Sequence, residues 1–386
     1  MAEWVERKIS DIGTVVGGAT PSTKKPENYE DGKIAWITPK DLSTFCSRYI
    51  ERGERNITEI GLKSCSTQLL PPNTVLFSSR APIGYVAIAA NEVCTNQGFK
   101  SVIPNENTDP LFLFYLLKYN KDKIEGMGSG TTFKEVSGNT MKNILVNVPT
   151  DKKMQEKIAA ILSSIDDKIE ENERINNNLE QQAHAIYQQM FIDNPDPDWI
   201  EGSLSDIANV TMGQSPSGCS YNEDGIGAIF FQGRAEFGFR FPTIRLYTTE
   251  PKRMAYANDI LMSVRAPVGD LNVAHNDCCI GRGLAAIHSK TNHQSFVLYT
   301  MFSLKKQLDV FNGEGTVFGS INRNSLNDMP ILIPDDEQIE KFELIVAPMD
   351  ATIRNNYDEI CRLQAVRDSL LPRLMSGELD VSNIDL

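Results

Sequence analysis

The sequence predicts an α+β protein in which two similar globular domains are separated by two long helices, as an internal repeat with pseudo-twofold symmetry. The first observation is the turn Ser78–Gly84, which reads Ser-Ser-Arg-Ala-Pro-Ile-Gly and recurs 185 positions later as Ser263–Gly269. The second is the set of short apolar runs, separated by Gly, Pro and Asn, that fills each half and is typical of strands and turns. The third is a helical pattern that begins after Pro149–Asp151 and again after Pro334–Asp336. Solenoid units are roughly 20 to 50 residues long, so this repeat is a duplicated domain with its helix.

Further elements repeat in the same order. Trp4 with Ser10–Gly13 recurs as Trp199 with Ser205–Ala208, at an offset of 195. Apolar runs such as Ile34–Ile37 predict strands, and one apolar helix is expected in each half, around 111–117 and 296–302. The resulting boundaries are a first globular domain at 1–150, a first long helix at 151–190, a linker at 191–206, a second globular domain at 207–334, a second long helix at 335–376 and a tail at 377–386.

The two long helical segments have the pattern of a coiled coil. Apolar residues recur in steps of three and four, and Asn172 and Asn356 fill the gaps in the two patterns. A polar residue at a core position fixes register, and two such helices in one chain pair most simply as an antiparallel coiled coil. The predicted seam residues are Ile158, Ile165, Asn172, Leu179, Ile186, Ile345, Met349, Asn356, Ile360 and Leu363. Alternatively, each helix packs only on its own domain, but some 35 residues at 1.5 Å each make a rod of roughly 50 Å, which favours a spacer.

Composition excludes several classes of protein. The net charge is −13, yet residues 1–150 and 207–334 each carry +1, because the excess acid lies on the helices, linker and tail. Nucleic acid therefore stays a possible partner, since binding depends on local patches.

With neither a signal peptide nor a run of 18 apolar residues, we expect a cytoplasmic protein without a membrane segment. The seven cysteines form no CxxC pair and have no histidine at zinc-ligand spacing, so we expect no metal site.

The chain lacks the motifs that would indicate catalysis. It has no GxxxxGK[ST] phosphate loop, no Asn-Pro-Pro-aromatic signature of a methyltransferase and no HExxH pair. Gly281–Gly283 is a bare GxG that opens no helix, so it is a poor candidate for a dinucleotide site. We therefore expect a protein that is not an enzyme by itself and has no cofactor in this chain.

The polar turns on the two globular domains are candidates for DNA contacts. The loop Gly128–Lys134 matches Gly313–Gly319, and small residues with Thr hydroxyls suit phosphate. Arg80 and Arg265 could clamp a phosphate or reach a guanine edge, or could brace the turn carbonyls instead. Positions that differ between the halves are better candidates for reading different bases. The predicted DNA-binding residues are Thr38, Lys40, Arg80, Gln97, Lys100, Ser129, Gly130, Thr131, Thr132, Lys134, Gln232, Arg234, Arg265, Arg282, Gly315 and Thr316.

In order and duplication, these motifs resemble the specificity subunit of type I restriction–modification enzymes. The resemblance includes Gly17–Ser22 with its partner Gly213–Ser217, both Ser-x-Arg-Ala-Pro turns, and the C-terminal Leu371–Leu379. It implies two target-recognition domains, each reading one half of a bipartite, asymmetric site in double-stranded DNA. Half-sites about one helical turn apart, roughly 34–36 Å or somewhat more, are expected.

The resemblance also implies partners for this chain. The helices would dock two modification subunits that carry S-adenosylmethionine and methylate adenine, and restriction subunits that use ATP and Mg can join them. Catalysis then lies in the partner subunits. The alternative is a two-headed protein–protein scaffold without DNA specificity, whose binding would be insensitive to salt.

Overall fold

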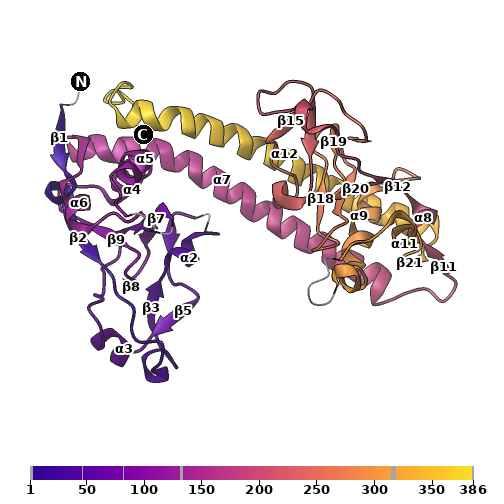
Figure 1. Ribbon diagram of the computed structural model, residues 1–386, viewed down its shortest axis with the longest axis horizontal. Coiled ribbons are helices and arrows are strands. Elements are labelled where there is room, and N and C mark those ends of the chain that lie inside the picture. The colour runs from indigo at the N-terminus through magenta and orange to yellow at the C-terminus, as the bar shows by residue number, and fades with distance from the viewer. Residues whose placement is uncertain (1–2, 46, 81, 131–133, 314–318, 385–386) are drawn as a thin grey trace. The chain divides into compact units, whose positions relative to one another are not determined.

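The computed structural model describes residues 3–45, 47–80, 82–130, 134–313 and 319–384. The chain folds as two compact units (Figure 1). Unit 1 comprises Met1–Glu173 with Glu359–Leu386, and unit 2 comprises Arg174–Asp358. Two long helices, α7 (Lys152–Tyr187) and α12 (Asp336–Met375), contribute to both units. Among the described helices, none is long and apolar enough to cross a membrane.

Unit 1 is a mixed α and β body. Its strands are β1 (Trp4–Lys8), β2 (Gly13–Gly17), β3 (Ile34–Ile37), β4 (Tyr49–Ile50), β5 (Arg55–Ile57), β6 (Val75–Ser79), β7 (Ile83–Ala89), β8 (Val93–Thr95), β9 (Lys100–Pro104) and β10 (Leu145–Pro149). Its short helices are α1 (Ile9–Ile12), α2 (Pro39–Leu42), α3 (Glu59–Lys63), α4 (Pro110–Tyr119), α5 (Lys121–Gly126) and α6 (Gly138–Asn143), with a 3₁₀ turn at Pro26–Asn28.

Unit 2 repeats this composition. Its strands are β11 (Ile200–Ser203), β12 (Ala208–Met212), β13 (Tyr221–Asn222), β14 (Ala228–Phe231), β15 (Leu246–Thr248), β16 (Met254–Ala255), β17 (Ile260–Ser263), β18 (Leu271–Val273), β19 (Cys278–Ile280), β20 (Leu284–Ser289) and β21 (Pro330–Ile333). Its short helices are α8 (Leu204–Ile207), α9 (Gln294–Ser303), α10 (Lys305–Leu308) and α11 (Arg323–Asn327), with a π-helical turn at Gln188–Ile192 and 3₁₀ turns at Gly218–Ser220, Arg234–Glu236 and Asp309–Asn312.

The strand pairing shows that the two bodies share one topology. The first and last strands of each body pair antiparallel, β1 with β10 and β11 with β21. The central sheet has the order β2-β9-β6-β7-β4 in unit 1 and β12-β20-β17-β18 in unit 2. A second sheet contains one parallel pair in each body, β3 with β8 and β14 with β19, flanked by the antiparallel β5 and β15.

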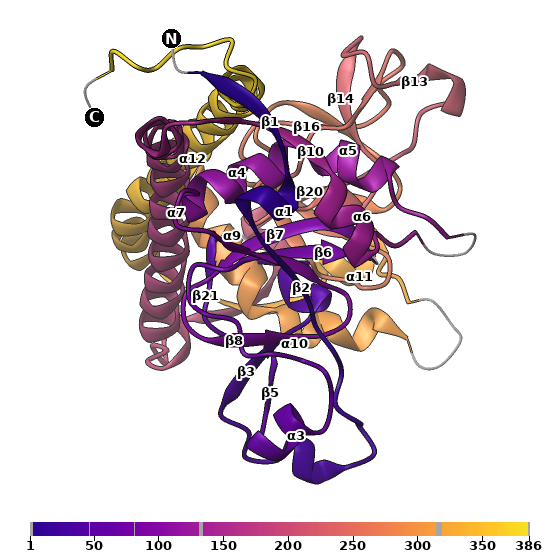
Figure 2. The same ribbon diagram turned by 90° about the vertical axis from the view of Figure 1, so that its left-hand side faces the viewer.

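One apolar helix in each body connects the central sheet to the long helices. The side chains of residues 112–117 on α4 are buried, and Asp109 caps the helix by accepting a hydrogen bond from the Phe112 N–H at 2.7 Å. Helix α4 packs between the sheet and α7 (Figure 2), in one apolar core that includes Ile158 and Leu162 of α7. In unit 2, α9 packs in the same way against Phe342 and Val346 of α12. The helices predicted at 111–117 and 296–302 thus attach each body to a long helix.

In unit 1, contacts between α7 and α12 run in opposite directions along the two helices. In unit 1, Arg367 pairs with Asp166 at 2.9 Å and Asn172 donates to Glu359 at 2.8 Å. In unit 2, Asn356 donates to Asn176 at 2.8 Å. The two asparagines at the gaps of the apolar patterns therefore bond to the facing helix.

Burial differs among the predicted seam residues. Ile158, Asn172 and Ile360 are buried, and Ile165, Leu179, Ile186, Met349, Asn356 and Leu363 are half-buried. Ile345, however, is 50% exposed while its neighbour Val346 is fully buried. The buried stripe of α12 passes through 342, 346, 353 and 360, so the structure departs from the prediction at position 345.

The segment expected to be a linker also contains regular structure. Of residues 191–206, positions 200–203 form β11, and α8 begins at Leu204. Ser203 and Asp206 form a capping box that starts this helix, with the Ser203 N–H donating to Asp206 at 2.7 Å. The second body therefore begins before position 207.

Candidate nucleic-acid interface

The parallel strand pair of each body brings two predicted residues to one edge. Thr38 follows β3 and Gln97 follows β8, and the Asn96 N–H donates to the Ile37 carbonyl at 3.0 Å. Because the carboxyl ends of parallel strands meet at the same edge of a sheet, these loops lie side by side. In unit 2, Gln232 follows β14 and Arg282 follows β19, with the Gly281 N–H donating to the Phe231 carbonyl at 2.8 Å.

The glycine-rich turn after the first strand of the central sheet packs against this edge. In unit 1 the Ala19 N–H donates to the Thr95 carbonyl at 3.0 Å, and a Cβ on Gly18 would lie 2.1 Å from that same oxygen. In unit 2 the Gln214 N–H donates to the Ile280 carbonyl at 2.9 Å, and a Cβ on Gly213 would lie 2.2 Å from the Gly281 carbonyl. Glycine is therefore required at both positions for the close approach of two backbones.

The turn that carries the repeated arginine is closed by its serine. In unit 1, Ser78 donates to the Pro82 carbonyl at 2.8 Å and accepts from the Tyr85 N–H at 2.8 Å. In unit 2, Ser263 donates to the Pro267 carbonyl at 2.6 Å and accepts from the Asp270 N–H at 3.0 Å. The serine thus braces the turn, a role that the sequence had left open for the arginine.

Each arginine turn is bonded to the edge described above. The Ser79 N–H donates to the Gly98 carbonyl at 2.7 Å, and the Val264 N–H donates to the Gly283 carbonyl at 2.9 Å. Backbone hydrogen bonds therefore join the glycine-rich turn, the loop after the parallel pair and the arginine turn in each unit. The side chains of these three segments, of the glycine-containing loop next to the arginine, and of the neighbouring Lys100 and Asp270 are here called the edge surface.

The second glycine-containing loop of each body is attached next to the arginine. The Val136 N–H donates to the Ser79 carbonyl at 3.0 Å, and the Ile321 N–H donates to the Val264 carbonyl at 3.1 Å. Ser129 and Gly130 are exposed, Gly130 has a φ of 134°, and Lys134 is exposed. The predicted contacts Thr131, Thr132, Gly315 and Thr316 lie outside the described residues.

The side chains of unit 1 at the edge surface are mostly paired. Arg80 lies 3.6 Å from the Glu135 carboxylate, and Lys100 lies 3.4 Å from it. Gln97 is exposed and accepts a hydrogen bond from Thr20, a residue of the glycine-rich turn.

Thr38 and Lys40 are each bound to an acid. The Thr38 N–H and hydroxyl both donate to Asp41, at 2.7 and 2.6 Å, so this threonine caps helix α2. Lys40 is exposed and pairs with Glu54 at 2.7 Å, and this hydrogen bond raises the pKa of Lys40 above its usual value. Lys40 is thus cationic at neutral pH.

Unit 2 presents a different set of side chains on the same frame. Three of its predicted DNA contacts are exposed, namely Gln232, Arg265 and Arg282. Neither arginine forms an ion pair with another described residue. The Arg282 N–H donates to the Ser215 hydroxyl at 3.2 Å, which links the loop to the glycine-rich turn. Arg234 pairs with Asp270, which also lies 3.2 Å from Lys305.

Sequence reasoning missed the acids of this surface and two buried arginines. Glu135 and Asp270 neutralise predicted cations, and only their position beside a repeated turn could have indicated them. Arg48 is 8% exposed and pairs with Asp167 and with Glu170, the latter at 3.2 Å, on α7. It anchors the body of unit 1 to the long helix.

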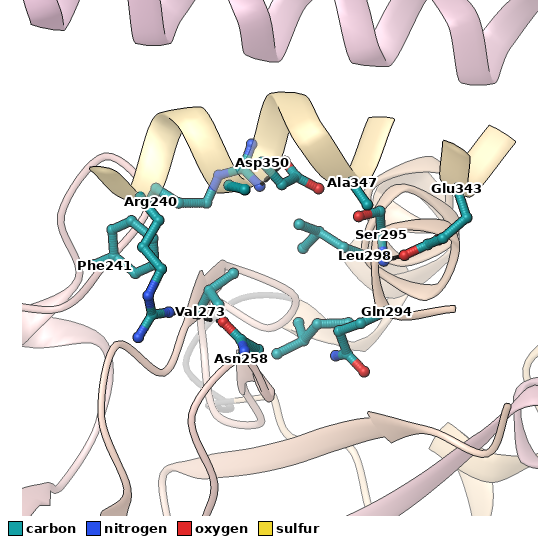
Figure 3. A pocket seen from close by; sticks show the side chains of 13 residues that line it. Arg240, Phe241, Asn258, Val273, Gln294, Ser295, Leu298, Glu343, Ala347 and Asp350 are labelled. Atoms are coloured by element: carbon teal, nitrogen blue, oxygen red, sulfur yellow. Dashed lines mark hydrogen bonds and ion pairs between the residues drawn. The ribbon is translucent and has the colours of Figure 1, made fainter. Parts of the chain in front are cut away.

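Arg240 anchors the body of unit 2 in the same way. Its side chain is 4% exposed and pairs with Glu180 on α7 at 2.9 Å and with Asp350 on α12 at 3.0 Å. Tyr299 of α9 accepts a hydrogen bond from Arg240 at 3.2 Å. Figure 3 shows Arg240 extended along α12 towards Asp350, at one wall of a cavity of about 300 Å³ that Phe241, Val273 and Leu298 also line. Burial raises the pKa of Glu180, and the Arg240 charge opposes this rise.

The described residues offer little to a metal ion. No group of three His, Cys, Asp or Glu side chains with suitable geometry occurs among them. Burial raises the pKa of the Cys94 thiol to about 11 and that of Cys278 to about 12, so both thiols are protonated at neutral pH.

Comparison with known proteins gives one consistent family. The family described as "Type I restriction modification DNA specificity domain" matches residues 1–181 and again 197–360. The chain is 33% identical to the type I restriction enzyme MjaIX specificity subunit of Methanocaldococcus jannaschii, over 99% of this chain and 95% of that protein. It is 28% identical to the putative MjaX specificity subunit of the same organism, over 98% and 94%. The crystal structure of a type I restriction–modification S subunit from M. genitalium has a TM-score of 0.63 at 17% identity, over 97% of this chain and 96% of that one.

Proposed function

Because the chain belongs to the family of type I restriction–modification DNA specificity subunits, we propose that its two bodies each read one half of a bipartite, asymmetric DNA site. The chain is a DNA-recognition subunit and carries no catalytic step of its own. In this proposal, residues 1–150 and 200–334 are the two target-recognition domains, because β11 at Ile200–Ser203 pairs with β21 and belongs to the second body. No observation favours the alternative of a protein–protein scaffold.

The observation that supports two different half-sites is a shared backbone frame with different side chains. Equivalent hydrogen bonds hold the edge surface in both units, at offsets of 185, 194 and 195 positions. On this frame Thr38 is replaced by Gln232, and Gln97 is replaced by Arg282. Base edges in the major groove are distinguished by their donors and acceptors, so different side chains read different bases.

The repeated features suit the part of the interface that does not depend on sequence. Arg80 and Arg265 lie at equivalent turns, and an arginine there binds a phosphate or a guanine edge. Exposed Ser129 and Lys134 add a hydroxyl and a cation beside Arg80. Such phosphate contacts position a protein on DNA, whereas base contacts specify the site.

The long helices complete the proposal. Residues 151–190 and 335–376 form an antiparallel coiled coil that spaces the two half-sites by roughly 34–36 Å or somewhat more and docks two modification subunits. Within unit 1, the contacts Arg367–Asp166 and Asn172–Glu359 follow opposite directions along the two helices and support the antiparallel pairing. S-adenosylmethionine belongs to the modification subunits, and ATP and Mg belong to restriction subunits where these join.

The test is sequencing of methylated adenine in DNA from cells that express this chain with its modification subunit. We expect a split, asymmetric motif. Replacing residues 1–150 by another recognition domain should change one half of the motif, and replacing 200–334 should change only the other half. An assembled complex that leaves no methylated motif would contradict the proposal and favour the protein scaffold.

A further inference from the structure

The edge surface of unit 1 contains a carboxylate between two cations. Glu135 Oε2 lies 3.6 Å from Arg80 Nη1, and Glu135 Oε1 lies 3.4 Å from Lys100 Nζ. The Glu135 side chain is 40% exposed, whereas that of Lys100 is 15% exposed. The lysine is therefore the more buried partner, and the Glu135 side chain is partly open to solvent.

The equivalent positions of unit 2 have the same net charge but a different set of polar groups. Arg265 pairs through its backbone with Ser320, just as Arg80 does with Glu135, and Ala285 stands where unit 1 has Lys100. Each trio carries +1. Only the trio of unit 1, however, offers a charged acceptor at its centre.

The carboxylate is not needed to hold its own loop. The Glu135 N–H donates to the Ser129 carbonyl at 2.9 Å, and the Ser129 N–H donates back to the Glu135 carbonyl at 3.0 Å. These two backbone bonds fix position 135 whatever its side chain. The side-chain contacts at 3.4 and 3.6 Å are longer than the 2.7–2.9 Å of a close charge-assisted hydrogen bond, so the lone pairs are incompletely used.

A carboxylate on a DNA-binding surface repels phosphate and so has to face a different group. Exocyclic amines of the bases are the donors that the major groove offers to a carboxylate, and cytosine N4 is the usual partner. We propose that Glu135 is a specificity-determining residue that accepts a hydrogen bond from an exocyclic amine, cytosine N4 or adenine N6, in the half-site read by unit 1. Arg80 and Lys100 hold the carboxylate towards the groove and offset its repulsion from phosphate. This inference rests on the function proposed above.

The experiment compares the methylated motif of the wild-type complex with the motifs of Glu135→Ala and Glu135→Gln. One base pair in the half-site of unit 1 should lose about 10- to 100-fold of its preference in Glu135→Ala, and less in Glu135→Gln, which keeps one acceptor oxygen. The base pair that becomes degenerate identifies the amine as that of cytosine or of adenine. The half-site of unit 2 should stay unchanged.

The matched control is Glu378→Gln, which removes an exposed carboxylate of unit 1 that pairs with Arg373 and lies outside the edge surface. It should leave every position of the motif unchanged. A motif unaltered in both Glu135 variants would overturn the proposal, as would weakening spread evenly over both half-sites. Absence of a split motif in the wild type would instead contradict the proposed function itself.

Discussion

Arg240 offers the sharpest test of how the second body is held on the long helices. Its side chain is 4% exposed and neutralises Glu180 and Asp350, which lie on different helices. Replacing it by methionine keeps an apolar chain of similar length but leaves both acids partly buried without a counter-charge. Removing one partner of a buried ion pair costs about 3–5 kcal/mol. In a unit of this size, each 1 kcal/mol lowers the melting temperature by about 2–4 °C, so we expect a loss of roughly 6–20 °C.

The assay is thermal and urea unfolding of the full chain followed by tryptophan fluorescence. With Trp4→Phe and Trp36→Phe in the background, Trp199 alone reports, and it lies in unit 2 against Phe191. Adding Glu180→Gln and Asp350→Asn to Arg240→Met should restore most of the stability, because no buried charge is then left unpaired.

The matched control is Arg234→Met, since Arg234 pairs with Asp270 at the surface and is 50% exposed. Its replacement should cost less than about 1 kcal/mol. A loss below about 1 kcal/mol in Arg240→Met, similar to this control, would refute the view that Arg240 anchors the body.

Lowering the pH should reduce the difference in free energy of unfolding between the wild-type protein and Arg240→Met. Burial already raises the pKa of Glu180, and loss of the opposing Arg240 charge raises it further. A carboxyl group whose pKa is higher in the folded than in the unfolded protein takes up a proton on folding. It therefore lowers the free energy of unfolding at high pH, and this destabilisation disappears as the pH falls through the folded pKa towards the unfolded pKa. Urea unfolding at pH 7.5 and 5.5 measures this, and a deficit that widens in acid would contradict the reasoning.

Three further predictions test the packing and the DNA contacts. Gly18→Ala should destabilise the first body by about 1–3 kcal/mol in urea unfolding, because the new Cβ would lie 2.1 Å from a carbonyl oxygen. In the control Gly218→Ala the new Cβ would have nothing within 4 Å, so stability should change by less than about 0.5 kcal/mol. Val346→Lys should cost about 3–5 kcal/mol by burying an unpaired charge, while Ile345→Lys should be nearly neutral; equal effects would contradict the buried stripe through position 346. Arg265→Ala should weaken binding of duplex DNA by the assembled complex and reduce the slope of log affinity against log salt by about 0.9, and an unchanged slope with unchanged affinity would exclude a phosphate contact.

Much of the fold follows from patterns that repeat within the chain. The turn Ser78–Gly84 and its copy at 263–269 predicted two equivalent bodies, and the two central sheets have the same strand order over four strands, with β4 added in unit 1. The apolar run on α4 predicted a buried helix, because a helix that is apolar on all sides has to be covered on all sides.

Other features depend on contacts that no local pattern encodes. Arg48 and Glu170 are 122 positions apart, and an isolated arginine in a loop has no periodicity that would indicate burial. The prediction that Ile345 is a seam residue was wrong for a different reason. After Phe342, an apolar pattern with steps of three and four can continue at 345 or at 346 with equal regularity. Only the core that covers Val346 decides between them. The candidate DNA contacts outside the described residues, such as Thr131 and Thr316, stay predictions.

In each body, the backbone hydrogen bonds that support the fold are distinct from the side chains that we propose to recognise DNA. This distinction explains which residues a comparison of the two halves of the sequence could identify. Backbone hydrogen bonds such as Val136 to Ser79 and Ile321 to Val264 recur 185 positions apart, since they depend on geometry and tolerate different side chains. Side chains that point away from this frame are free to differ, as Glu135 and Ser320 do. Repetition within the chain therefore identifies the backbone that supports the fold. The positions that differ between the two halves are those at which a substitution should change the recognised DNA sequence while the domain stays folded.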